Sequence, residues 1–379
     1  MQDALASSIG KTILQNAESF FLYDFKQCQQ AFLGAYQAFD GEKHHQFYPL
    51  DVLHGSNNSS EDLGTDTIWL GPLDAKQVLV FISGTHGVEG YCGSAIQQFF
   101  LSQLSESLIL QAILPEDTAI LMIHSLNPWG MHWARRCDAS GIDLNRNFVD
   151  YDKVEALDPE YDGILSTLMN SKDRYQEMHN QSEKWGQQTF DRIFSGGQYV
   201  HKWAPFFGGR FPAHGRKVIE QLIELYDLPT RNTMVIDLHT GLGPWAFGEL
   251  ISDHLVNSHG NQQAKDVFGA AIANAHEGAS FSVPKAGLLD YCFHKFMHEK
   301  GFFLTLEFGS YGSAALFEVL LSDHVYWREN EPTSVNDPDY QFYRERMIEH
   351  FCPKDVIWQQ AVLFKAWQIF DRLIHSIKH

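Results

Sequence analysis

The chain has 379 residues, of which 44% are hydrophobic and 20% are charged, a composition typical of a folded globular protein. Its formal net charge is −19 at pH 7. An acidic chain lacks the basic surface that binds phosphate backbones, which argues against nucleic acid as a partner. The same charge disfavours an anionic membrane surface. An anionic substrate would have to be attracted by a local cluster of arginines.

No apolar run approaches the roughly 18 residues that indicate a membrane span. Residues 1–20 lack the basic start and apolar core of a signal peptide. The five cysteines are odd in number and contain no CxxC pair, which favours reduced thiols and a cytoplasmic protein. With no repeat and no low-complexity linker, we predict a single domain over 1–379.

Hydrophobic periodicity predicts a series of helices and strands along the chain. Within the domain, residues 149–231 show a weak pattern with glycine punctuation, which indicates an insertion that shapes a binding site. The C-terminal segment has an apolar helical face that is expected to pack on the sheet. The other predicted elements are helical segments within 11–40, 95–104, 217–226, 263–278 and 286–300, and strands at 46–53 and 67–70.

Four further apolar runs each stop at a polar loop. They begin at Val78, Ala119, Thr233 and Gly301, and runs of this kind bounded by glycine predict buried strands of an α/β sheet. In open α/β sheets, ligands bind outside the carboxyl ends of the strands, so the residues that follow the runs should meet at one edge. These residues are His86, Glu89, Arg135, Arg136, Asn145, Arg146, His239 and Glu307.

His86 and Glu89 are three residues apart on a loop beside glycines, a spacing that lets both reach one ion. His239, arriving from another strand end, would complete a His₂Glu set, which is a known ligand set for catalytic zinc with an open position for water. The HxxE spacing alone is weak, and the prediction of one Zn²⁺ per chain depends on the joint layout. Residues that could lie near a second ion are His54, His124, His132 and Asp143.

Glu307 ends an otherwise apolar strand, where an unpaired carboxylate is costly. It could form a structural salt bridge with an arginine. It could also be a general base with a raised pKa that accepts a proton from metal-activated water, and the predicted metal site nearby favours this second interpretation.

Arg135, Arg136, Asn145 and Arg146 offer donors suited to a substrate carboxylate or a developing oxyanion. The structural alternative for the arginines is ion pairing with Asp138 or Asp143. Asp143 itself is better suited to holding a metal ligand or an arginine in place.

Together, the HxxE motif, the segment GIDLNRNF at 141–148, His239 and Glu307 resemble the zinc carboxypeptidase (M14) superfamily, closest to its DUF2817 branch. The resemblance implies a central mixed, mostly parallel α/β sheet of about eight strands with helices on both faces. It implies that His86, Glu89 and His239 bind zinc and that Glu307 is the general base.

The same resemblance implies that Asn145 and Arg146 hold the terminal carboxylate of the substrate. Arg135 or Arg136 would stabilise the oxyanion, and we favour Arg136.

One feature departs from the superfamily, whose peptidases carry a tyrosine on a mobile loop before the catalytic glutamate. The corresponding stretch here has Phe281 and Ser282. Tyr291 follows at a position expected for a structural aromatic residue, and Tyr199 or Tyr311 could replace the missing residue from elsewhere.

The leading hypothesis is a zinc metallocarboxypeptidase that cleaves an amide bond next to a free carboxylate in a small peptide. An alternative is an N-acyl amino acid deacylase of the aspartoacylase and desuccinylase kind, because several arginines and a missing tyrosine are compatible with a small acidic substrate. A third hypothesis is a non-catalytic metal-binding protein on the same scaffold, which an intact ligand set with an intact base disfavours.

Overall fold

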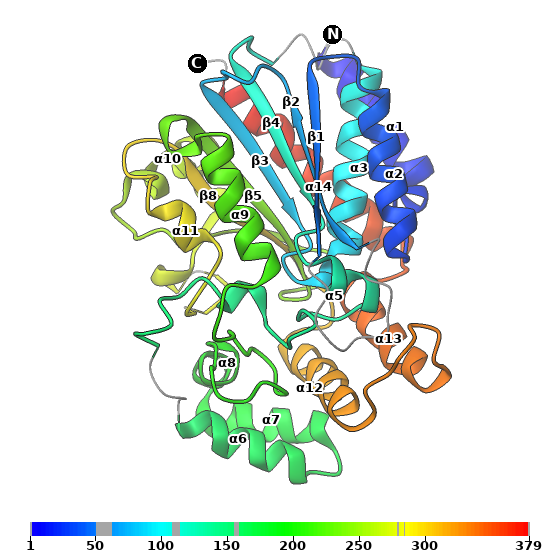
Figure 1. Cartoon of the computed structure of the whole chain (residues 1–379), viewed down its shortest axis with the longest axis vertical. Coiled ribbons are helices and arrows are strands. Elements are labelled where there is room, and N and C mark those ends of the chain that lie inside the picture. The colour runs from blue at the N-terminus through cyan, green and yellow to red at the C-terminus, as the bar shows by residue number, and fades with distance from the viewer. Residues whose placement is uncertain are drawn as a thin grey trace.

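The computed structural model describes residues 2–50, 63–107, 114–154, 159–278, 280–283 and 285–377. Within these ranges the strands form one eight-stranded sheet in the order β1-β2-β4-β3-β5-β8-β6-β7 (Figure 1). The strands are β1 (Lys43–Pro49), β2 (Gly64–Leu70), β3 (Gln77–Ser83), β4 (Thr118–His124), β5 (Asn232–Thr240), β6 (Gly248–Ser252), β7 (Ile272–Asn274) and β8 (Phe302–Phe308).

The centre of the sheet is parallel, because β3 pairs in parallel with both β4 and β5, and β5 pairs in parallel with β8. Towards the two edges the pairs β1–β2, β2–β4 and β6–β8 are antiparallel, and β6–β7 is again parallel. The predicted mixed α/β sheet is therefore confirmed.

The four central strands are the four apolar runs that precede the polar motifs. Nearly every residue of β3, β4, β5 and β8 is buried, as expected for parallel strands covered on both faces. Their carboxyl ends point to the same edge of the sheet, so the residues that follow them are brought together.

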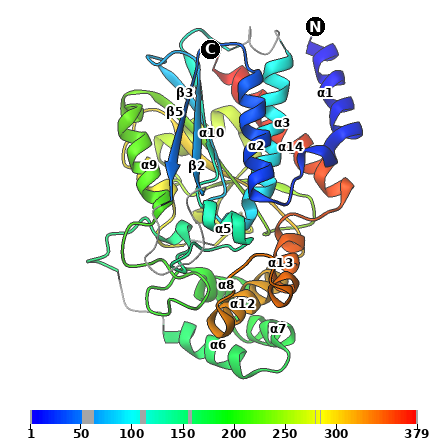
Figure 2. The same cartoon turned by 45° about the vertical axis from the view of Figure 1, so that its right-hand side comes forward.

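Helices cover both faces of the sheet (Figures 1 and 2). One face is covered by α2, α3, α10 and α14, with α1 packed on α14, and the other packs against α9 and α11. No helix in the described ranges is long and apolar enough to cross a membrane. The helices on the two faces are α1 (Gln2–Asn16), α2 (Phe25–Ala38), α3 (Gly90–Glu106), α9 (His214–Leu225), α10 (His259–Phe268), α11 (Asp290–His294) and α14 (Val356–Ser376).

A second group of helices lies beyond the carboxyl ends of the strands (Figures 1 and 2). Three of them come from the segment 149–231 and pack together and against α12. They therefore form a wall over the edge of the sheet where the polar motifs meet. These helices are α5 (Pro128–Trp133), α6 (Pro159–Asn170), α7 (Arg174–Trp185), α8 (Gln187–Ser195), α12 (Ser313–Asn330) and α13 (Pro338–Phe351).

Two predicted helices were wrong in part. In 263–278, α10 ends at Phe268 because Gly269 takes a positive φ of +63°, and the next residues pair with β6 as β7. In 286–300, only α11 is α-helical. It begins after Gly287, which takes a φ of +70° where the chain passes close to the carbonyl of Arg146. The strand predicted at 46–53 ends at Pro49, and residues 51–53 lie outside the described ranges.

Candidate metal centre

Three residues from two neighbouring strands meet at the edge of the sheet. His86 follows β3, Glu89 ends the short 3₁₀ helix Gly87–Glu89, and His239 lies near the end of β5. His86 Nδ1 is 2.7 Å from Glu89 Oε1, and His239 Nδ1 is 3.0 Å from Glu89 Oε2 and 3.2 Å from His86 Nδ1. All three side chains are buried.

The turn that carries His86 and Glu89 is packed tightly against α5. A Cβ added at Gly87 would lie 2.1 Å from the carbonyl carbon of Gly130, so only glycine fits at this position. Close packing therefore requires a glycine between His86 and Glu89, and the same packing holds the turn in one position.

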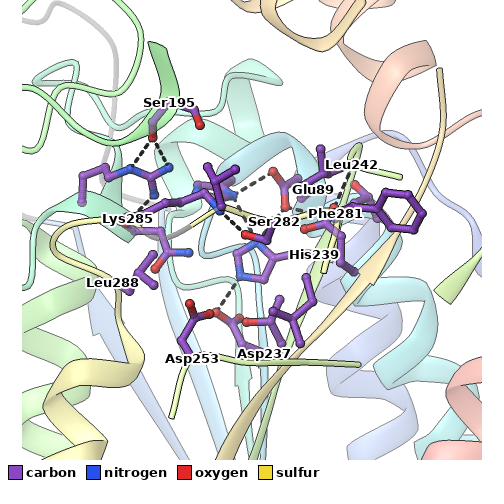
Figure 3. Close-up of a pocket in the computed structure, with 18 of the residues that line it drawn as sticks. Glu89, Ser195, Asp237, His239, Leu242, Asp253, Phe281, Ser282, Lys285 and Leu288 are labelled. Carbon is purple, nitrogen blue, oxygen red and sulfur yellow. Dashed lines mark hydrogen bonds and ion pairs between the residues drawn. The ribbon is translucent and has the colours of Figure 1, made fainter. Parts of the chain in front are cut away.

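The outer nitrogen of each histidine is held by a carboxylate. His86 Nε2 lies 3.2 Å from Asp143 Oδ1, and His239 Nε2 lies 2.7 Å from Asp237 Oδ2. Figure 3 shows His239 between Asp237 and Glu89. Such contacts fix the ring orientation of histidines that bind metals and leave the other nitrogen facing inward. The sequence analysis missed Asp237, although its place two residues before His239 on the same strand put both on one face of the sheet.

The geometry of the three ligand atoms fits a zinc ion. A tetrahedral site with bonds of roughly 2.0–2.1 Å separates its nitrogen and oxygen ligands by about 3.3 Å. The two histidine nitrogens lie 3.2 Å apart, close to that value, and each contacts one of the two oxygens of Glu89, at 2.7 and 3.0 Å. With one ligand atom taken from each residue, all three atoms lie within 4.8 Å of one another. Within the described ranges, His86, Glu89 and His239 are the one group of residues placed to hold a metal.

The residues predicted near a second ion do not extend this group. His124 Nε2 lies 2.8 Å from Ser94 Oγ in the core, and His132 packs against aromatic rings. Asp143 lies behind His86, and His54 is outside the described ranges.

Electrostatics keep the carboxylates of Glu89 and Asp143 ionised. Burial alone would raise the pKa of Glu89, but the neighbouring His86 and His239 lower it below its ordinary value. Burial would also raise the pKa of Asp143, and Arg136 with His86 lowers it well below the usual range. The site is therefore an acidic cluster suited to a cation.

Glu307 lies directly beside this cluster because β5 and β8 are paired with His239 opposite Glu307. Its Oε1 accepts a hydrogen bond of 3.0 Å from the backbone N–H of Leu242. Burial, with the charge of Glu89, raises the pKa of Glu307 to about 7, and His239 opposes the shift. Within the described ranges no arginine forms a salt bridge with it, so the structural alternative for this carboxylate has no support there.

The two adjacent arginines lie on different sides of the chain. Arg136 lines the pocket over the metal centre, and it donates to Asp143 from Nε at 2.9 Å and to Glu89 from Nη1 at 3.1 Å. Arg135 does not line this pocket; its Nε donates to Asp323 at 2.8 Å. The structure thus places Arg136, and not Arg135, at the candidate site.

Asn145 and Arg146 line the same pocket. Arg146 is held by main-chain carbonyls, with Nε and Nη2 donating to Ser195 O at 3.0 and 2.7 Å and Nη1 donating to Asn145 O at 2.6 Å. The Oδ1 atom of Asn145 accepts a hydrogen bond of 2.8 Å from Leu289 N–H. Both side chains are therefore fixed in place with donors remaining.

None of the three candidate tyrosines lines the pocket. Tyr199 donates to the carbonyl of Arg146, Tyr311 to Glu349 and Tyr291 to the carbonyl of Lys285. The replacement of the missing loop tyrosine by one of them has no geometric support among the described residues.

Several pocket residues were missed because they lie outside the motif strands. Asp253 follows β6, Asp290 begins α11, Ser195 ends α8 and Lys285 lies on the loop before α11. Figure 3 shows Ser195, Lys285 and Asp253 around the histidine that the motif did identify. These residues are recognised as pocket residues only because the fold brings them together, and their spacing in the sequence gives no signal of it.

The chain belongs to the family described as "Protein of unknown function (DUF2817)", whose model matches residues 21–365. No curated protein sequence matches the chain.

Solved structures agree with this fold. Bovine thrombin-activatable fibrinolysis inhibitor, in complex with tick carboxypeptidase inhibitor, is 10% identical with a TM-score of 0.50, over 93% of this chain and 99% of that chain. Another structure of thrombin-activatable fibrinolysis inhibitor is 11% identical with a TM-score of 0.52, over 92% and 81%. At such identity the likeness concerns the fold alone.

Proposed function

We propose that the protein is a zinc-dependent hydrolase that cleaves an amide bond next to a free carboxylate, as a metallocarboxypeptidase does. One observation carries the proposal. The Nδ1 atoms of His86 and His239 and the carboxylate of Glu89 converge beside Glu307, in a pocket that Arg146 also lines.

Zinc in this ligand set would lower the pKa of bound water and polarise a carbonyl group. Glu307 lies in position to accept the proton of the attacking water, and its raised pKa of about 7 makes it a suitable base near neutral pH. The same carboxyl can then return the proton to the leaving amine. The hydrogen bond from Leu242 N–H holds one of its oxygens during both transfers.

Arg136 is the donor for the oxyanion. Two of its N–H groups are engaged by Asp143 and Glu89, and those contacts hold the guanidinium plane. A guanidinium has five N–H donors, so Nη2 is left to stabilise negative charge on the carbonyl oxygen of the substrate.

Asn145 and Arg146 form the carboxylate anchor. The three hydrogen bonds of Arg146 go to neutral carbonyls, so the guanidinium keeps its charge and two further N–H donors. The Nδ2 group of Asn145 can donate to the same carboxylate, because its Oδ1 is already engaged by Leu289. A charged bidentate contact of this kind selects substrates with a free carboxylate.

A second candidate function is N-acyl amino acid deacylation. It is supported by the enclosure of the pocket, which receives walls from α8 (Ser195), from the chain before α9 (Phe206), from the loop at Ser282 and from α12 (Phe317). Such walls favour a short substrate.

The five cysteines are free and buried, which supports the proposal that the protein works in a reducing compartment such as the cytoplasm. The proposed partner is therefore a small peptide or an N-acyl amino acid in that compartment. Neither substrate requires a nucleic acid or a membrane.

The two functions are distinguished by amine release from a matched panel. The zinc-loaded protein is given free-carboxylate peptides, the same peptides as C-terminal amides, and N-acetyl and N-succinyl amino acids. Release from the free-carboxylate peptides and not from the amides supports a carboxypeptidase. Release only from N-acyl amino acids supports a deacylase, and no release from any of them contradicts both.

A further inference from the structure

The loop before α11 is attached directly to the carboxylate anchor. Leu289 N–H donates to Asn145 Oδ1, and Gly287 passes so close to Arg146 that an added Cβ would lie 2.3 Å from the Arg146 carbonyl oxygen. Phe148 N–H in turn donates to Gly287 O at 3.1 Å. The loop and the anchor therefore form one unit, so a side chain at the start of this loop has a fixed relation to Arg146.

Lys285 begins this part of the loop and lines the pocket (Figure 3). Its amine donates to the hydroxyl of Ser282, and its own carbonyl accepts from Tyr291. An ammonium group has three N–H donors, so two remain for another partner. Within the described ranges no carboxylate forms an ion pair with this amine.

The charges around Lys285 favour a bound anion. Loss of water around the amine lowers its pKa to about 8, and Arg146 is the largest charge effect in the same direction. Asp253 and Glu307 oppose the shift, and Arg136 adds to it. Two cations thus lie close together in one pocket, and a bound anion between them would relieve their repulsion.

We propose that Lys285 is a substrate-binding residue that contacts the same carboxylate as Arg146 and Asn145. This inference rests on the proposed function, since it assigns a further contact to the carboxylate anchor of that site. A carboxylate can accept about four hydrogen bonds, so it can accept from Arg146, Asn145 and Lys285 together. The loop that carries Lys285 contacts the backbone of Arg146 and the side chain of Asn145, which allows both cations to reach one carboxylate.

The proposal requires Lys285 to act on binding and not on the chemical step. A lysine that donates to a carboxylate is replaced in part by arginine, because both carry a positive charge, whereas methionine keeps the length and removes the charge. Charged hydrogen bonds in a water-poor pocket have effects on affinity of roughly tenfold to a hundredfold.

The test is direct binding of reaction products, which needs no turnover. Calorimetry measures the affinity of the zinc-loaded protein for leucine, lysine and glutamate and for their α-amides. Lys285→Met should weaken all three free acids by about tenfold or more and leave the amides unchanged. Lys285→Arg should keep most of the affinity. Lys295→Met, a nearby exposed lysine with the same change in net charge, should have no effect.

Three outcomes would overturn the proposal. Equal losses for acids and amides would show a general effect on the pocket. A loss confined to glutamate would assign Lys285 to a side-chain carboxylate, and no loss for any ligand would remove the contact altogether. Thermal unfolding of each variant separates these outcomes from a folding defect.

The proposed hydrolase function can fail separately from this inference. If the native protein releases no amine from any substrate but still prefers free acids through Lys285, the carboxylate contact stands without the reaction. If it hydrolyses free-carboxylate peptides and Lys285→Met changes kcat with KM unaltered, the reaction stands and the carboxylate contact is wrong.

Discussion

Arg135 and Arg136 are neighbours in sequence and have opposite surroundings. They follow α5, which is capped by Ala134 in a left-handed conformation with a φ of +52°. Arg135 pairs with Asp323, and its guanidinium carbon lies 4.4 Å from the ring centre of Trp327. Arg136 turns to the other side, towards the metal centre.

The difference between the two arginines shows how a structural buried charge is distinguished from a functional one. Arg135 has a carboxylate partner and aromatic rings of Trp129 and Trp327 beside it, a full set of contacts for a cation. Arg136 is also buried and paired, but its remaining donors face a pocket. The direction of the uncommitted donors, and not burial or pairing, distinguishes the two arginines.

The largest expected effect on kcat comes from replacing Glu307, the proposed general base in the pocket. Glu307→Gln should reduce kcat by roughly 10² to 10⁴, because the amide cannot accept the proton of water. Zinc should remain bound at the native stoichiometry, since the ligand set is intact; activity assays and metal analysis measure the two. Glu249→Gln on β6, the residue paired with Glu307, is the matched control and should stay active. An active Glu307→Gln variant would contradict the assignment.

Removal of the pocket arginine should have the next effect. Arg136→Met is expected to lower kcat by about 10² to 10³, the cost of losing one preorganised oxyanion donor. Arg136→Lys should recover little, because lysine cannot contact Asp143 and Glu89 while also donating into the pocket. Steady-state kinetics on a free-carboxylate peptide measure both. Normal kcat in Arg136→Met would remove this arginine from the reaction.

The pH dependence should follow the ionisation of Glu307. Burial raises the pKa of this carboxyl to about 7, and the base works only when deprotonated, so kcat/KM should increase with pH below that value. The loss is about tenfold per pH unit on the acid side. Binding of a cation offsets the charge of Glu89, so the midpoint of the loaded enzyme should lie lower than 7. A profile that falls as pH rises from 5 to 7 would contradict this sign.

The smallest effect on rate is expected at Arg135. Arg135→Met should leave kcat/KM unchanged in the folded fraction and lower the free energy of unfolding by about 3–5 kcal/mol, because Asp323 is left buried without its partner. Denaturant unfolding measures the loss. The double variant Arg135→Met with Asp323→Leu should regain part of it. A fall in kcat without a fall in stability would reverse the comparison between the two arginines.

Much of the fold and of the metal triad could be predicted because their signals are local. Each central strand is an apolar run that glycine or a polar residue ends, and parallel strands leave those ends at one edge. Glu89 and His86 are one turn apart, and His239 and Glu307 each lie near the end of a strand.

The rest depends on contacts between distant segments. Arg135 and Arg136 cannot be distinguished by spacing, since the turn at Ala134 decides which one reaches the pocket. Lys285 was missed because its proposed role depends on its position beside Asn145 and Arg146, which lie more than a hundred positions earlier in the chain. The strand β7 was predicted as part of a helix because three residues are too few to show a period.

The carbonyl that holds Arg146 belongs to Ser195, the last residue of α8. The guanidinium therefore meets the negative end of a helix dipole, whose partial charge orients a cation without neutralising it. A carboxylate in the same place would compete with the substrate for the arginine. Helix α8 thus acts as an electrostatic support, and its position, held by α6 and α7, determines whether the guanidinium of Arg146 is aligned with the pocket.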